Sequence, residues 1–137
     1  MTFDERAYAS DVLRVSGGAN VFSSRARQYP LAADLGRREA WSEERVAGRD
    51  TRYPRIRLDE VVERGAVLAL LPDEPYAFTE GDATELRSLG GASQLSVELV
   101  DGKDLFWYGT HVARAVERLG SVFVRFRSRS LGTSAHN

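Results

Sequence analysis

The chain has 137 residues, of which 19 are Lys or Arg and 20 are Asp or Glu, so its formal net charge is -1. A chain of this size suits a single domain with one hydrophobic core. The balanced charge excludes a large electrostatic field of one sign, and we therefore expect no nucleic-acid partner. Cysteine is absent, which excludes disulfides, thiolate metal sites and cysteine nucleophiles.

Neither the start of the chain nor its apolar runs indicate a membrane segment. Residues 1–6 are polar and partly acidic, whereas a secretory signal has basic residues followed by an apolar run. The longest apolar stretch, residues 65–71, is far too short to cross a bilayer. The sequence therefore predicts a soluble protein, which stays in the cytoplasm if it is made as written.

The first third of the chain predicts one helix followed by a long loop. Apolar residues recur at near-helical spacing from Asp4 onward, and the Gly17-Gly18 pair suits a left-handed C-cap. Residues 23–53 show little periodicity, apart from a short helix that we expect over residues 38–46. Long loops inside compact domains are often functional, so this stretch favours a binding role.

Pro54 marks a boundary, after which a short helix over residues 58–62 precedes the apolar run 66–71. Unbroken apolarity is typical of a strand that is covered on both faces, as in a parallel sheet. We expect Pro72 to end this strand.

The second half of the chain repeats the alternation of helix and strand. A helix over residues 79–89 begins at Thr79, a favourable N-cap, and a second strand follows over residues 96–100. Residues 110–119 place their apolar side chains on one helical face. The chain from Arg125 onward is basic and rich in serine, and we expect it to fray.

The order strand, helix, strand, helix is typical of right-handed parallel crossovers. We therefore expect an α/β fold: a single three-layer, Rossmann-like lobe over residues 1–122 with a small, mostly parallel sheet, then a basic tail over residues 123–137. Only two strands are clear, fewer than the four to six of a usual sheet. This shortage predicts a sheet edge that is either exposed or covered in an unusual way.

Both predicted strands lead into loops rich in aromatic residues, at residues 72–78 and 101–109. Ligands of open parallel sheets bind beyond the carboxyl ends of the strands, and rigid rings bury apolar area at low entropic cost. These loops therefore predict a ligand-binding edge; the alternative is that the rings plug the ends of the core. The residues that we expect at this edge are Glu74, Tyr76, Phe78, Trp107 and Tyr108.

Four segments, in this order, resemble helical-backbone metal receptors, which are the cobalamin-type and iron-chelate-type substrate-binding proteins of ABC importers. The segments are Gly17–Phe22, Arg52–Val61, Leu70–Phe78 and Leu99–Gly109. The resemblance covers residues 1–119 and corresponds to the C-terminal lobe of a class III periplasmic-binding-protein-like fold. The N-terminal lobe, the interlobe helix and the opening strand of this lobe have no counterpart. Tyr76-Ala77-Phe78 stands where the family has Tyr-Pro-Phe, and Ala66-Val67 where relatives carry Pro-Asp.

The resemblance implies a ligand, a partner and a location. Its ligand would be cobalamin or a ferric chelate, held between two lobes, in the periplasm or cell envelope. The side chains facing the cleft would be Tyr53, Tyr76, Trp107 and Tyr108. The family's carboxylate that docks on the ABC permease falls on Asp59, with Glu60 beside it. Half a cleft should bind weakly, so a missing N-terminal lobe or a second copy of the chain would complete it.

Two functions remain open: a ligand-binding lobe of an importer, or a truncated or repurposed lobe that binds proteins without a small-molecule ligand. An enzyme is not expected, because no nucleophile with an adjacent base, Walker loop or Gly-x-Gly-x-x-Gly occurs. No cofactor or metal is expected either. His111 stands beside the aromatic loop, but the only other histidine is His136 in the tail, and transition-metal sites need three or four ligands.

Overall fold

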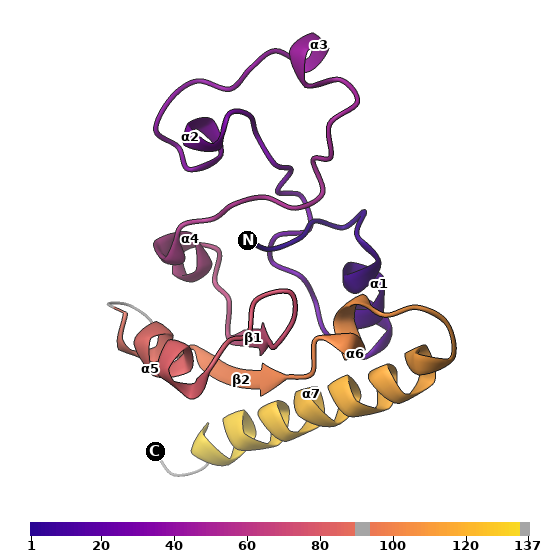
Figure 1. The fold of residues 1–137 in the computed structure, drawn as a ribbon. Helices are drawn as coiled ribbons and strands as arrows, with labels where there is room; N and C mark the ends of the chain where they lie inside the picture. The colour runs from indigo at the N-terminus through magenta and orange to yellow at the C-terminus, as the bar shows by residue number, and fades with distance from the viewer. Residues whose placement is uncertain (90–93, 135–137) are drawn as a thin grey trace.

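The computed structural model describes residues 1–89 and 94–134, and Figure 1 shows their arrangement. It combines helices with a two-stranded parallel sheet, which is a small α/β arrangement. The elements in chain order are α1 (Tyr8–Val15), α2 (Leu31–Asp34), α3 (Glu43–Val46), α4 (Leu58–Glu63), β1 (Leu68–Pro72), α5 (Glu80–Ser88), β2 (Ser96–Val100), α6 (Lys103–Phe106), the 3-10 turn η1 (Gly109–His111) and α7 (Val112–Ser134). No helix in the described ranges has the length and apolarity that a bilayer crossing needs.

The two strands pair as predicted, in parallel, with Leu68 opposite Ser96 and Pro72 opposite Val100. β1 begins two residues later than expected and includes Pro72, which we expected to end it. Pro72 can belong to the strand because only every second residue of β1 bonds to β2. The Val67 carbonyl accepts from the Ser96 N–H, and the Asp73 N–H donates to the Val100 carbonyl, so the odd-numbered residues of this stretch face β2. Pro72 therefore faces away from β2, where its missing N–H breaks no ladder bond.

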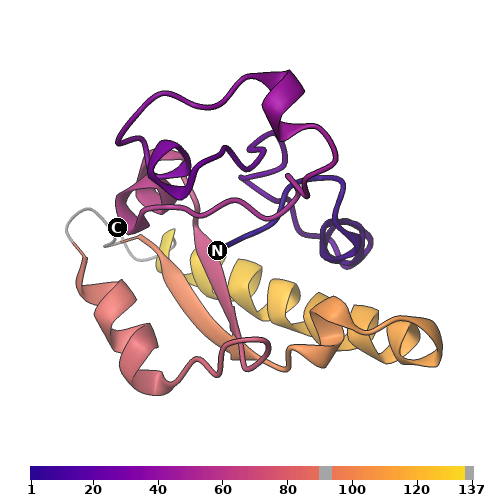
Figure 2. The ribbon, with the colours of Figure 1, turned by 45° about the horizontal axis from the view of Figure 1, so that its top comes forward.

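Apolar clusters cover both faces of the sheet, which explains the unbroken apolar run. On one face, Ala69, Leu71 and Val97 pack with residues of α4 and α5, including Val61 and Leu86. On the other face, Leu68, Leu70 and Val100 pack with residues of α1, α6 and α7. Figures 1 and 2 show α7 running along the sheet, while the excursion that carries α2 and α3 stands apart from α7.

α1 is shorter than predicted because Asp4 belongs to a turn. The buried Asp4 carboxylate accepts a hydrogen bond from the Arg6 N–H at 2.9 Å, and the Asp4 N–H donates to the Arg52 carbonyl at 2.8 Å. The helix therefore begins at Tyr8. Its end agrees with the prediction, since Gly17 has a φ of 96°, in the left-handed region.

The long loop is present as predicted, but its helices differ from the expectation. The expected helix over residues 38–46 is reduced to one turn, α3, which begins after Ser42 with two glutamates at its positive end. A second single turn, α2, was not predicted. The rest of residues 23–53 is irregular chain.

The tail that we expected to fray from Arg125 is helical through Ser134, as the last part of α7. Tertiary contacts hold this part of the helix in place. Phe123 is buried in the cluster around α1, Arg127 donates to the Gly17 carbonyl at 3.2 Å, and Arg129 donates to the Glu98 carboxylate at 2.8 Å. Residues 135–137, with His136, lie outside the described residues.

Thr79 is the N-cap of α5, as predicted, and the start of the helix is a capping box. The Thr79 hydroxyl accepts from the Asp82 N–H, and the Asp82 carboxylate accepts from the Thr79 N–H at 2.7 Å. The Asp82 carboxylate accepts from the Thr79 N–H and, at 2.8 Å, from the Thr79 hydroxyl, and these two bonds, in this order of size, lower the pKa of Asp82 from its ordinary value of 3.8.

Replacing Thr79 with Ala should destabilise the protein by on the order of 1 kcal/mol at neutral pH, because the N-cap acceptor is lost. Folding lowers the pKa of Asp82, so the ionised carboxylate stabilises the folded state. This stabilisation is present above pH 3.8 and is lost as the pH falls through the lowered pKa. Urea unfolding at pH 7 and pH 3 measures both effects. Because the Asp82 carboxylate keeps its bond from the backbone N–H in Thr79→Ala, its part is tested with Asp82→Asn, whose destabilisation should shrink as the pH falls through the lowered pKa; a loss that does not change with pH would contradict the carboxylate's part in the cap.

Candidate functional site

The two aromatic loops meet at the carboxyl ends of β1 and β2, as the sequence predicted. The Gly102 N–H donates to the Asp73 carboxylate at 2.7 Å, and Trp107 Nε1 donates to Glu74 Oε2 at 3.2 Å. Gly102 also lies so close to Glu74 that a Cβ at position 102 would stand 2.7 Å from the Glu74 Cβ. The loops therefore form one connected edge, which we call the aromatic edge: residues 72–78 and 101–109.

Three of the predicted rings face solvent, so they do not simply plug the core. Tyr76 is 59% exposed, Trp107 50% and Tyr108 74%. Tyr76 also stacks edge-on against Phe78, with ring centroids 4.7 Å apart. Exposed, mutually supported rings are available to bury area against a ligand.

Tyr8 of α1 supports the edge from outside the two loops. Its ring centroid lies 4.4 Å from that of Tyr108, and its hydroxyl donates to the Trp107 carbonyl at 3.1 Å. Burial and the neighbouring Tyr108 raise the pKa of Tyr8. Sequence reasoning missed this residue, because nothing in the helical pattern distinguishes Tyr8 from an ordinary core residue.

A mostly apolar cavity of about 1380 Å³ adjoins the aromatic edge and continues along β1. Four of the predicted ligand residues line it: Tyr53, Glu74, Tyr76 and Phe78. Trp107 and Tyr108 are not among its lining residues and stand on the outer side of the same edge. The structure thus brings all six predicted residues to one region, in two groups that the Trp107–Glu74 bond links.

Two charged features of the cavity wall were not predicted. Asp50 lines the cavity, and hydrogen bonds from the side chain and backbone of Arg52 lower its pKa to about 2. Arg27 also lines the cavity and stacks on the Tyr29 ring at 4.6 Å. The Arg27 Nε is buried and has no hydrogen-bond partner among the described residues.

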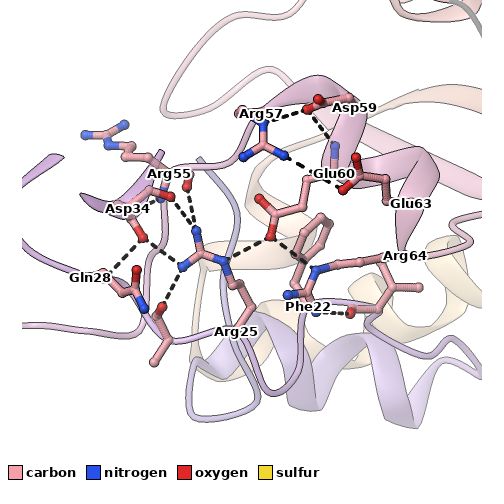
Figure 3. Close-up of polar contacts among 12 residues, drawn as sticks. Phe22, Arg25, Gln28, Asp34, Arg55, Arg57, Asp59, Glu60, Glu63 and Arg64 are labelled. Carbon is pink, nitrogen blue, oxygen red and sulfur yellow. Dashed lines mark hydrogen bonds and ion pairs between the residues drawn. The ribbon is translucent and has the colours of Figure 1, made fainter. Parts of the chain in front are cut away.

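The two expected docking carboxylates have different surroundings, as Figure 3 shows. The Asp59 side chain is 61% exposed at the first turn of α4 and pairs with Arg57 at 2.9 Å. The Glu60 side chain is only 13% exposed and lies between Arg25 at 3.0 Å and Arg64 at 3.2 Å. Asp59 is therefore accessible, as expected, whereas Glu60 belongs to an internal ion-pair network.

That network joins the long loop to α4 through Arg25. Besides Glu60, the Arg25 guanidinium binds the Asp34 carboxylate at 2.8 Å and the Asp34 carbonyl at 2.6 Å. The Asp34 side chain is fully buried and also accepts from the backbone N–H groups of Gln28 and Arg55. The charges of this network are satisfied internally, so its role is structural.

His111 has a structural partner and no cluster of metal ligands around it. Its Nε2 lies 2.9 Å from Asp104 Oδ1, and Arg118 binds the same oxygen at 3.2 Å. Within residues 1–89 and 94–134, no group of three or more His, Asp or Glu side chains could hold a metal ion. The buried Asp104 thereby joins α6 to the start of α7.

No family model, curated protein sequence or solved structure matches this chain.

Proposed function

We propose that this chain is a ligand-binding lobe of an ABC-importer substrate-binding protein, and that its ligand is a metal chelate such as cobalamin or a ferric siderophore. The fold that we propose with it is a three-layer, Rossmann-like lobe. One observation carries the proposal: the aromatic edge lies at the carboxyl ends of two parallel strands, exposes Tyr76, Trp107 and Tyr108, and adjoins a large cavity.

The chemistry of the edge suits a broad, partly apolar ligand with polar groups at its margin. The exposed rings bury area with little loss of side-chain entropy. The cavity exceeds the usual 300–1,000 Å³ of ligand pockets, roughly as a large ligand requires.

The exposed edge covers only one side of such a ligand. A second lobe, or a second copy of the chain, would therefore supply the other wall in the periplasm or cell envelope. For contact with the permease, Asp59 is the residue that we propose, because it is accessible and Glu60 is engaged with Arg25 and Arg64.

Isothermal titration with cyanocobalamin and with a ferric siderophore tests the proposal. Trp107→Ala and Tyr76→Ala should each weaken binding by roughly tenfold, because each removes an exposed ring worth about 1–1.5 kcal/mol at the contact. The matched control is Trp41→Ala, since Trp41 pairs with Tyr29 away from the edge. Absence of binding to the unaltered chain at millimolar ligand, or equal loss in all three variants, would contradict the proposal.

A second candidate is a protein-interaction module without a small-molecule ligand. Trp107 and Tyr108 favour this candidate, because both are exposed and lie outside the cavity lining. Trp and Tyr are enriched among the residues that contribute most to protein–protein binding. The same titration separates the two, because this candidate requires that no chelate binds.

A further inference from the structure

The outer edge of β1, on the side away from β2, has no partner strand in the described residues. The sheet consists of β1 and β2 only, and Figures 1 and 2 show β2 along one side of β1 with irregular chain across from the other. A two-stranded sheet has only marginal stability by itself. An unpaired edge is a template for a further strand.

The backbone groups on this edge belong to Leu68, Leu70 and Pro72. Val67 and Asp73 bond to β2 through their backbone groups. The even-numbered residues between them therefore point their N–H and C=O groups away from β2. For Leu68 and Leu70, no hydrogen bond of these outward groups is found within residues 1–89 and 94–134. Two N–H groups and three carbonyls therefore face outward at the spacing of a strand ladder.

The cavity described above runs along this same edge. Every residue from Gly65 to Pro72 lines it, together with residues 1–3 and 17–22. Because Leu68 and Leu70 pack on one face of the sheet and Ala69 and Leu71 on the other, a strand placed beside β1 would meet apolar surface on both faces. The space accordingly suits an extended backbone with apolar side chains at consecutive positions.

We propose that an extended, apolar peptide segment binds along the outer edge of β1 and adds a third strand to the sheet. Its main chain bonds to Leu68 and Leu70, and its side chains fill the cavity between β1 and residues 17–22. A peptide main chain carries donors and acceptors at the spacing of these outward groups.

A peptide fits this position better than the sheet edge of a second folded copy. The edge is recessed, because it is part of the wall of a cavity that residues 1–3 and 17–22 also line. A single extended segment can enter such a cavity, whereas a strand that carries its own neighbouring helices would collide with the other lining residues. The peptide would occupy the cavity that adjoins the aromatic edge, so it and a chelate that enters the cavity would exclude each other, whereas Trp107 and Tyr108 lie outside the cavity lining.

The test uses a synthetic peptide of five alternating Val and Leu residues between solubilising Lys pairs, with a control peptide that has Pro at the centre. Fluorescence anisotropy of labelled peptide measures binding, and NMR hydrogen exchange follows individual amides. We expect the first peptide to bind and to slow exchange of the Leu68 and Leu70 N–H groups at least tenfold, with no effect of the control peptide.

Val67→Glu should weaken peptide binding at least tenfold, because Val67 lines the cavity and an unpaired carboxylate would then face the apolar peptide. Val67 is 52% exposed, so the variant can fold. The matched control is Leu131→Glu, a 74% exposed residue of α7 that does not line the cavity.

Three results would overturn the proposal: no binding, binding that leaves the Leu68 and Leu70 amides unprotected, or protection of these amides without peptide in a dimer detected by light scattering. The last result would make a second copy the occupant. Trp107→Ala should leave peptide binding unchanged, so failure of this proposal and failure of the chelate proposal are distinguishable.

Discussion

Replacing Asp34 with Ala should lower the free energy of unfolding by about 3–5 kcal/mol, because it leaves the Arg25 guanidinium largely buried without its main counter-charge. The Arg25 side chain is only 14% exposed, and Asp34 is fully buried. The variant also removes the acceptor for the N–H groups of Gln28 and Arg55. Glu60, the remaining partner of Arg25, is shared with Arg64 and cannot replace these backbone bonds.

Urea unfolding followed by circular dichroism measures this loss. Asp11→Ala is the matched control, since Asp11 pairs with Arg14 on the exposed surface of α1 and should contribute no more than about 1 kcal/mol. Backbone exchange in residues 25–57 should also accelerate, because Asp34 holds this part of the long loop against Arg55. Equal destabilisation by the two substitutions would show that the Arg25 network does not anchor the loop.

Replacing Gly102 with Ala should separate the two loops of the aromatic edge and destabilise the protein by about 1–3 kcal/mol. The added Cβ would stand 2.7 Å from the Glu74 Cβ and 2.8 Å from the Glu74 backbone nitrogen, and backbone cannot move aside as a flexible side chain can. The displacement should break the Trp107–Glu74 hydrogen bond, which spans the two loops. Chelate binding should weaken with it if the rings act together.

Tryptophan emission and thermal unfolding measure the effect of Gly102→Ala. Gly132→Ala is the control, because Gly132 lies in α7 with no atom within 4 Å of the added Cβ, and alanine there should stabilise the helix by up to about 1 kcal/mol. An unchanged emission spectrum in Gly102→Ala would mean that the two loops are not held in contact at Glu74.

The local sequence determined the elements with strong periodicity or clear end signals. The apolar run before Pro72 is a strand with apolar clusters on both faces, and Ser96–Val100 pairs with it in parallel. Thr79 marked the start of a helix, because its side chain accepts from a backbone N–H of the first turn. Gly17 marked the end of a helix, because it adopts a left-handed conformation. Both signals act within one helical turn. Parallel pairing followed from the helix between the strands, and it placed the aromatic loops at one edge.

Tertiary contacts decided what neighbouring residues cannot encode. α7 continues past Arg125 because Arg127 and Arg129 reach Gly17 and Glu98, which are distant in sequence. Asp59 and Glu60 are adjacent carboxylates in the chain. Asp59 is accessible to solvent, whereas Glu60 is largely buried because its side chain pairs with Arg25. Tyr8 joins the aromatic edge through α1, and the cavity is lined by β1 together with N-terminal segments that are distant from it in the sequence. Local propensity acts over a few residues, whereas burial and ion pairing depend on which distant segments the fold brings together.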